Sequence, residues 1–242
     1  MSEGAFTIDK TKRFVPFDIN QDDLQRRTPG SLLVEIQPFL VITSKDIILL
    51  DTGLGFGDPV GLLQIIKTLS SHGISASDVT KVLMSHLHKD HAGGMTLQSS
   101  GHPESITFEN ATYYINREEF DLAISTPGPS YRIEDYKALK NSDRLQLTDG
   151  EGVLDGYIKY EVTGGHSVYH QVFWIIENGE KIFYGGDVAP QLQQMKSKFV
   201  AKYDFNGKSS MELRQQWWKQ GQEEKWTFLF YHDIKYPVYK FS

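Results

Sequence analysis

Three histidines and an aspartate fall within six residues of the chain, in the order His-x-His-x-Asp-His: His86, His88, Asp90 and His91. The preceding run, residues 79–84, is apolar and β-branched, which predicts a strand that leads into a loop. In an extended backbone, side chains two residues apart project to the same side, so one cation could take both His86 and His88. Asp90 and His91 follow where the chain should turn, and as neighbours they point elsewhere. This arrangement suits a second cation beside the first.

The ordinary alternatives are histidines of a surface loop or a helix cap built on Asp90. A single His-x-His pair would favour them, but the longer pattern is more demanding and, with the later residues, favours a metal site. Imidazole and carboxylate ligands suit Zn(II), Mn(II), Fe or Co(II), and the chain has no cysteine that could supply a thiolate. The Gly93-Gly94 pair predicts a tight bend below the ligands.

Four other segments place polar residues where predicted strands end. They are Leu49–Gly53 (LLDTG), Thr163–His166 (TGGH), Tyr184–Asp187 (YGGD) and Tyr231–Asp233 (YHD). Together with the His-x-His-x-Asp-His motif, these elements occur in the order that is typical of the metallo-β-lactamase superfamily of metal-dependent hydrolases. The chain resembles that family over roughly residues 30 to 242.

The resemblance implies two divalent metal ions, with zinc first on family grounds and Mn, Fe or Co as alternatives. The implied ligands are two groups of three and one bridging carboxylate: His86, His88 and His166; Asp90, His91 and His232; and Asp187 between the groups. A hydroxide that bridges the metals would be the nucleophile. Asp90 would be the catalytic residue that orients this hydroxide and passes a proton to the leaving group.

Two further residues are expected beside the ligands rather than among them. Asp51 is expected near the histidine loop, and an ordinary turn-forming role is its alternative. His170 resembles the family's second histidine after the Thr-Gly-Gly-His turn, which is usually not a ligand. We expect it to pack against the ligands or to support one of them.

The fold that the resemblance implies is α+β: a four-layer αββα sandwich of two mixed sheets flanked by helices. Strands and helices alternate in both halves, and no linker divides residues 1–242, which predicts a single domain. Residues 124–142 are expected to form a lid or wall over the site, with a solvated connection as the alternative. Loop shape there and over residues 188–210 is expected to set the substrate.

Local patterns predict several elements. Alternating residues over 7–20 predict a strand or extended entry, and 21–30 has the composition of a loop. Asp58-Pro59 predicts the start of a helix that Gly73 ends. The sequence Ser209-x-x-Glu212 resembles a capping box that opens a helix to about residue 224. Trp217 and Trp218 on that helix could line a pocket, although aromatic residues at helical positions are more often core.

Composition limits the class of partner. The net charge of −6 and the lack of a basic run argue against nucleic acid. No apolar run approaches the roughly 20 residues that span a bilayer, so no membrane contact is expected. The first residues show no secretory signal, which makes the cytoplasm the expected location. The expected partner is a small-molecule substrate, and the oligomeric state is left open with a homodimer among the alternatives.

The leading hypothesis is a binuclear hydrolase of small esters, with lactones favoured because the pattern resembles the metallo-lactonase branch. That branch commonly has a tyrosine where this chain has Pro190, and Tyr184 or Tyr231 could substitute for it. Thioester hydrolysis as in glyoxalase II, and phosphotriester, sulfate ester or β-lactam hydrolysis, are the alternatives among hydrolases. A mononuclear iron oxidoreductase and a non-catalytic binding protein on the same fold are the alternatives of other classes.

Overall fold

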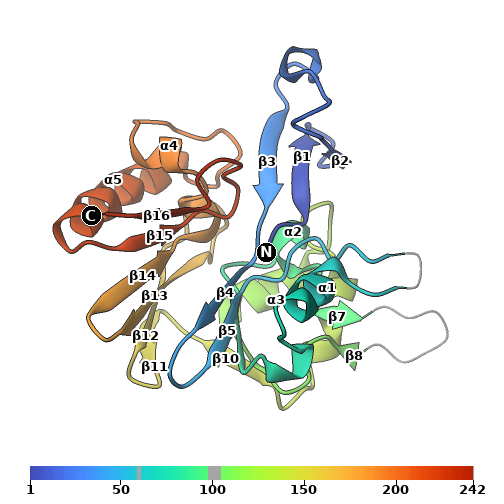
Figure 1. Ribbon diagram of the computed structural model, residues 1–242, viewed down its shortest axis with the longest axis vertical. Helices are drawn as coiled ribbons and strands as arrows, with labels where there is room; N and C mark the ends of the chain where they lie inside the picture. Colours follow the sequence, from blue (N-terminus) through green and yellow to red (C-terminus); the bar gives the residue numbers. More distant parts are fainter. Residues whose placement is uncertain (59–60, 98–104, 242) are drawn as a thin grey trace.

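The computed structural model describes residues 1–58, 61–97 and 105–241. Its first large sheet has the strand order β10-β9-β6-β5-β4 (Figure 1). The edge strand β4 is antiparallel to β5, whereas the other neighbours are parallel. The strands are β4 (Phe39–Ile42), β5 (Ile47–Leu50), β6 (Lys81–Leu83), β9 (Thr112–Asn116) and β10 (Leu145–Thr148).

The second large sheet has the order β11-β12-β13-β14-β15-β16, and its β14–β15 pair is parallel within an otherwise antiparallel sheet. The strands are β11 (Glu151–Leu154), β12 (Ile158–Val162), β13 (Gln171–Glu177), β14 (Glu180–Tyr184), β15 (Thr227–Leu229) and β16 (Val238–Lys240). Asn178 and Gly179, both with positive φ, form the two-residue hairpin turn between β13 and β14.

Alternation along the strands produces three separate apolar layers. In β5, Ile48 packs between the two sheets whereas Leu49 packs on the outer face of the first sheet. In β13, Phe173 packs between the sheets whereas Trp174 packs on the outer face of the second sheet. Both sheets are therefore buried on two faces, as the expected αββα sandwich requires.

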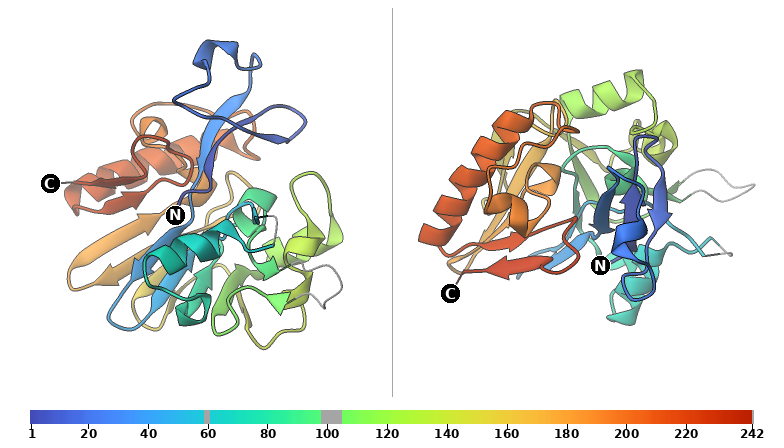
Figure 2. Two further views of the ribbon diagram at one scale, coloured as in Figure 1. Left: turned by 45° about the vertical axis from the view of Figure 1, so that its right-hand side comes forward. Right: turned by 90° about the horizontal axis from the view of Figure 1, so that it is seen from above.

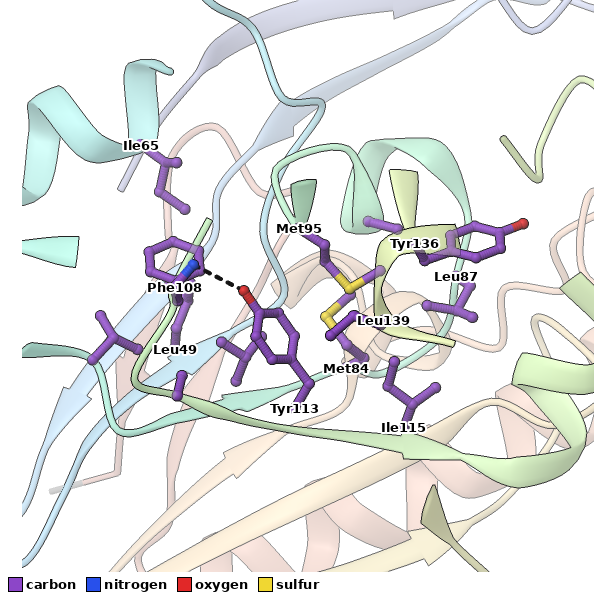
Figure 3. Packing of buried hydrophobic residues seen from close by; sticks show 14 of the residues in the cluster. Leu49, Ile65, Met84, Leu87, Met95, Phe108, Tyr113, Ile115, Tyr136 and Leu139 are labelled. Carbon is purple, nitrogen blue, oxygen red and sulfur yellow. Dashed lines mark hydrogen bonds between the residues drawn. The ribbon is translucent and has the colours of Figure 1, made fainter. Parts of the chain in front are cut away.

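Helices cover the outer faces. The helices α1 (Gln64–Ser71) and α3 (Arg117–Ser125) pack on the first sheet, and α5 (Gly207–Glu223) packs on the second (Figures 1 and 2). Figure 3 shows the core beneath α1, where Leu49 and Ile65 lie close to Phe108. The Tyr113 hydroxyl accepts the Phe108 N–H at 3.0 Å, so this buried phenol has a partner.

A third, three-stranded sheet of order β2-β1-β3 projects from the sandwich (Figures 1 and 2). Its antiparallel strands are β1 (Gly4–Ile8), β2 (Phe14–Pro16) and β3 (Leu32–Ile36). The predicted extended entry over residues 7–20 is thus a strand, a turn and a second strand, and the predicted loop contains the short 3₁₀ helix η1 (Leu24–Arg26).

The remaining elements are short. They are α2 (Lys89–Ala92), α4 (Leu192–Met195), β7 (Thr96–Leu97), β8 (Ser105–Ile106), and the 3₁₀ helices η2 (Ala76–Asp78), η3 (Ile133–Asp135), η4 (Lys137–Leu139) and η5 (Gly186–Val188). Within the described ranges, no helix is both long enough and apolar enough to cross a bilayer.

Two predicted helix starts are wrong. The helix α1 begins at Gln64, because Asp58 is used in a turn in which its carboxylate accepts the Leu62 N–H at 2.9 Å; Pro59 lies outside the described residues. The helix α5 begins at Gly207, because the Asn206 side chain, rather than Ser209, is the cap and accepts the Ser209 N–H at 3.1 Å.

The two tryptophans of α5 belong to the core. Trp217 is 3% exposed, with its ring centroid 4.8 Å from that of Phe183, and Trp218 packs against Phe228 and Phe241. The structure therefore favours the core interpretation over the pocket interpretation.

Candidate metal centre

Three histidines from two segments converge at one end of the sandwich. His86 and His88 follow β6, and their ring centroids are 4.4 Å apart. His166 follows β12 after two glycines with positive φ, and its Nε2 lies 3.1 Å from His88 Nδ1. One nitrogen from each ring lies within 4.8 Å of the other two, a spacing that one cation can bridge.

The Asp187 carboxylate lies between this group and a second one. It follows β14, and its Oδ2 is 3.1 Å from His166 Nε2. Its Oδ1 is 3.1 Å from His91 Nε2 and 2.9 Å from His232 Nε2. Asp90 completes the second group, because its Oδ2 lies 3.9 Å from His91 Nε2 and 3.7 Å from His232 Nε2. The structure thus brings all seven predicted ligands together.

Several buried atoms at the centre lack hydrogen bonds. Among the described residues, His86 Nε2, His91 Nε2 and Asp187 Oδ1 have no hydrogen-bond partner of good geometry. Buried polar atoms are nearly always paired, and leaving one unpaired costs about 1–3 kcal/mol. Imidazole nitrogens and carboxylate oxygens that lie this close together are the ligand atoms that divalent cations bind. The residues therefore fit two metal ions.

In His91, His166 and His232, the Nδ1 atom on the side away from the metal centre contacts an oxygen. His91 Nδ1 lies 2.7 Å from Asp51 Oδ2, His166 Nδ1 lies 2.9 Å from Asp204 Oδ1, and His232 Nδ1 lies 2.7 Å from the backbone oxygen of Glu35. Such contacts fix ring orientation and leave Nε2 free for a metal. Asp204 and Glu35 were not predicted from the sequence, since nothing in the surrounding residues marks them.

Asp51 lies directly behind the histidine loop, at the end of β5. Its carboxylate accepts the Ser85 N–H at 2.7 Å and the Tyr184 hydroxyl at 2.5 Å, besides contacting His91. Its φ is 54°, in the left-handed region that aspartate tolerates better than most residues. This carboxylate orients a proposed ligand and links two segments that deliver ligands, the loop after β6 and the end of β14.

His170 is fully buried and its Nε2 accepts the Asp187 N–H at 3.1 Å. Gly186, with φ of 47°, lets this contact form, because a Cβ there would lie 2.7 Å from His170 Nε2. His170 thus supports the backbone of Asp187, and it belongs to none of the three ligand groups found among the described residues.

Glu119 was missed by sequence reasoning. It is 1% exposed, and it accepts hydrogen bonds from Leu87 N at 3.1 Å, Tyr131 Oη at 2.9 Å and Ser167 Oγ at 3.0 Å. Leu87 precedes His88 and Ser167 follows His166, while the Tyr131 ring packs on His88 at 4.9 Å between centroids. One carboxylate therefore links both segments that supply the first group.

The role predicted for Gly93 and Gly94 needs a correction. Gly93 has ordinary helical angles (φ −61°, ψ −25°), so it makes no unusual bend. A Cβ on Gly93 would lie 2.2 Å from the Leu54 backbone oxygen, and one on Gly94 would lie 2.2 Å from that of Thr52. Both positions need glycine because the loop after β5 passes directly against them.

The electrostatics favour cations. Burial and the neighbouring imidazoles lower the pKa of His86 and His88 well below the usual value, which keeps both neutral and able to bind a metal. Burial opposes ionisation of His91 and His232, but the carboxylates of Asp187 and Asp90, joined by Asp51 at His91, together outweigh it and raise the pKa of both histidines. Their positive charge in turn lowers the pKa of buried Asp187. Bound cations would replace this charge.

A cavity of about 350 Å³ opens beside Asp90, Asp187 and His232. The three-stranded sheet β2-β1-β3, called the N-terminal sheet, supplies much of the cavity wall, including Phe14 and Leu32. The sequence did not predict this contribution. Residues 188–210 contribute as expected, for example through Tyr203. Among the described residues of 124–142, only Ser130 lines the cavity.

Neither tyrosine proposed to replace the one missing at Pro190 lines this cavity. The Tyr184 hydroxyl bonds to Asp51, and the Tyr231 hydroxyl donates to the Asp90 backbone oxygen at 2.6 Å. Tyr203 does line it, and burial raises the pKa of this phenol to about 12, so it keeps its proton.

A family model described as the metallo-β-lactamase superfamily matches residues 35–222, more than half of the chain. The chain belongs to the metallo-β-lactamase superfamily. Among solved structures, this superfamily member resembles a probable metal-dependent hydrolase from Staphylococcus aureus, with a TM-score of 0.78, 25% identity, and coverage of 99% of this chain and 90% of the other. AidC, a dizinc quorum-quenching lactonase, gives a TM-score of 0.73 at 20% identity, covering 98% and 87%. The predicted αββα fold is confirmed.

The curated relatives of this metallo-β-lactamase superfamily chain are longer proteins, and the match covers only part of each. The lactamase-like protein nscB of Neosartorya fischeri is 28% identical over 163 residues, 66% of this chain and 40% of nscB. The thioesterase pkgB of Emericella nidulans is 28% identical over 161 residues, 66% and 38% respectively. The N-acyl homoserine lactonase AttM of Agrobacterium fabrum is 27% identical over 168 residues, 64% and 58%. The chain thus spans about two fifths of the fungal relatives.

Proposed function

We propose that the protein is a binuclear metal-dependent hydrolase of small esters, with lactones the favoured substrates. The observation that carries this proposal is the position of Asp187. Its two oxygens lie 2.9–3.1 Å from Nε2 of three histidines that belong to two ligand groups. A carboxylate placed in this way can bridge two cations, and bridging is the arrangement that two-metal hydrolysis uses.

In this proposal His86, His88 and His166 would hold the first cation, Asp90, His91 and His232 would hold the second, and Asp187 would be shared. Zinc is the first candidate because the donors are imidazoles and carboxylates and because AidC is described as a dizinc enzyme; Mn, Fe and Co remain alternatives. When bound, two such cations polarise the scissile carbonyl and lower the pKa of water, which makes hydroxide available near neutral pH.

The chain's own groups would then guide protons and substrate. Asp90 faces the cavity, and its Oδ2 is farther from the histidines of its group than Asp187 Oδ1 is. Asp90 is therefore the carboxylate placed to accept a proton and return it to the leaving group. The Tyr203 phenol also lines the cavity and, because it stays protonated, can donate a hydrogen bond to a substrate oxygen.

Lactones are favoured because AidC and AttM are named as lactonases. Thioesters are the second candidate, since pkgB is named a thioesterase, and phosphotriesters are a third. An iron oxidoreductase or a non-catalytic protein is disfavoured by the complete ligand set, because both groups retain all their imidazoles.

The test is metal stoichiometry by elemental analysis, followed by turnover of N-hexanoyl homoserine lactone, a thioester and a phosphotriester. We expect two ions per chain, loss of turnover on chelation, and its return with zinc. His88→Ala and Asp187→Ala should abolish turnover with unchanged circular dichroism. His72→Ala, an exposed histidine on the same sandwich, is the matched control. Near wild-type turnover in either ligand variant would refute the site, and a single iron per chain would favour oxygen chemistry.

A further inference from the structure

Basic side chains gather in the cavity of an otherwise acidic chain. The net charge is −6, yet Lys12, Arg27 and Lys89 all line the cavity. The acidic side chains among the described lining residues are Asp90 and Asp187, and both are proposed metal ligands. Two divalent cations carry more positive charge than these two carboxylates balance. The occupied cavity would therefore have a net positive wall, which favours an anionic ligand.

Lys12 is held at the cavity by its backbone. Its N–H donates to the Asp9 backbone oxygen at 3.1 Å, and its own backbone oxygen accepts Lys89 Nζ at 2.6 Å. The Lys89 ammonium also lies 5.4 Å from the centroid of the Phe14 ring. Because Lys89 lies between the ligands His88 and Asp90, these contacts fasten the β1–β2 turn beside the metal centre.

The charged ends of Lys12 and Arg27 are free to meet a ligand. Within the described residues, Lys12 Nζ has no hydrogen bond or ion pair, and the Arg27 guanidinium makes one contact, from Nε to the Leu24 backbone oxygen at 3.2 Å. Both residues line the same cavity as Asp90 and Asp187, so their charges face the space beside the proposed ligands.

Much of the rest of the cavity wall is apolar. Ile8, Phe14, Leu32 and Val34 line it on the side of the N-terminal sheet, and Phe199 lines it as well. A substrate that fits would place its ester carbonyl at the ligand groups and an apolar segment along this wall. An anionic end of that substrate would meet Lys12 and Arg27, which line the same cavity.

We propose that Lys12 and Arg27 form an anion subsite, and that the substrate is an ester or lactone carrying a carboxylate on a short apolar chain. This inference rests on the proposed hydrolase function and specifies its substrate class. Charge-assisted hydrogen bonds in a partly enclosed cavity supply selectivity on the order of tenfold.

The test compares two activated esters that differ only at the far end of a six-carbon acyl chain: mono-(4-nitrophenyl) adipate, which ends in a carboxylate, and 4-nitrophenyl hexanoate, which ends in a methyl. We expect the zinc-loaded enzyme to show a kcat/KM about tenfold higher for the adipate ester at low ionic strength, and the ratio should shrink at high salt. Lys12→Met and Arg27→Met should lower the ratio. Lys10→Met removes the same charge from the same turn outside the cavity lining, and should keep it.

Failure of the subsite and failure of the hydrolase proposal give different results. A ratio near one in the wild type, or one that Lys12→Met leaves unchanged, overturns the subsite while hydrolysis stands. If neither ester is cleaved, ester hydrolysis is refuted, and binding of adipate and hexanoate by calorimetry decides the subsite. Tighter binding of adipate that is lost in Lys12→Met supports it, whereas equal affinities overturn it.

Discussion

Removing the Glu119 carboxylate should weaken metal binding without touching a ligand. Glu119→Ala leaves Leu87 N, Tyr131 Oη and Ser167 Oγ without their shared acceptor. At about 1–1.5 kcal/mol for each lost buried hydrogen bond, and with some relief from no longer burying a carboxylate, the free energy of unfolding should fall by about 3 kcal/mol. Because Leu87 and Ser167 adjoin His88 and His166, metal affinity should fall about tenfold or more.

Two control variants separate the loss of the buried hydrogen bonds from the loss of a negative charge on this helix. Glu119→Gln can keep an oxygen toward Leu87 and Tyr131 and turn its amide toward Ser167, so it should cost only about 1 kcal/mol. Glu118→Ala removes an exposed carboxylate from the same helical turn and should change little. Urea unfolding of metal-free protein measures stability, and competition with a chromophoric chelator measures zinc affinity.

The reasoning would be refuted in either of two ways. If Glu119→Ala unfolds within about 0.5 kcal/mol of the wild type, the hydrogen bonds do not stabilise the fold. If its stability falls while zinc affinity stays the same, Glu119 is a packing residue and does not position His88 and His166.

Three further predictions concern stability. Trp217→Ala should lower the free energy of unfolding by about 3–5 kcal/mol, because the ring packs against Phe183 in the outer core; a loss below about 1 kcal/mol in urea unfolding would contradict this. Burial raises the pKa of Glu3 to about 7, so the folded state binds the proton more tightly than the unfolded state does. The free energy of unfolding should therefore fall by roughly 3 kcal/mol between about pH 4.5 and a pH above 7. Glu3→Gln should flatten that trend. Gly93→Ala should destabilise the protein and lower its metal content, since its Cβ would meet the Leu54 backbone oxygen at 2.2 Å, and a normal melting temperature would count against that clash.

The fold layers and the ligand set were expected from the resemblance to the metallo-β-lactamase superfamily, and the motifs that carry this resemblance are local. Alternating strands such as β13 carry the layer pattern, and a histidine or aspartate at a strand end needs no distant partner to be noticed. Asp204 and Glu119 were not predicted because their roles depend on partners that are distant in the sequence. Asp204 is 38 residues from His166, and Glu119 is 48 residues from Ser167.

Local rules also failed where two residues competed for one role. Asp58 and Ser209 both suit a helix cap, but Asp58 caps a turn before α1, whose N-cap is Leu63, and Asn206 caps α5 in place of Ser209. The N-terminal wall of the cavity could not be foreseen, because alternation within β1 and β2 predicts strands without saying what they face.

Part of the cavity wall and the proposed metal ligands come from different parts of the chain. The family model begins at residue 35, whereas Ile8, Lys12 and Phe14 of the cavity wall precede it. This stretch can therefore diverge without disturbing any proposed ligand, and a graft of residues 1–34 from a relative could carry over that relative's preference for substrate. One constraint limits such a graft: Glu35 is paired through its backbone to His232, so the register of β3 must be preserved at the junction.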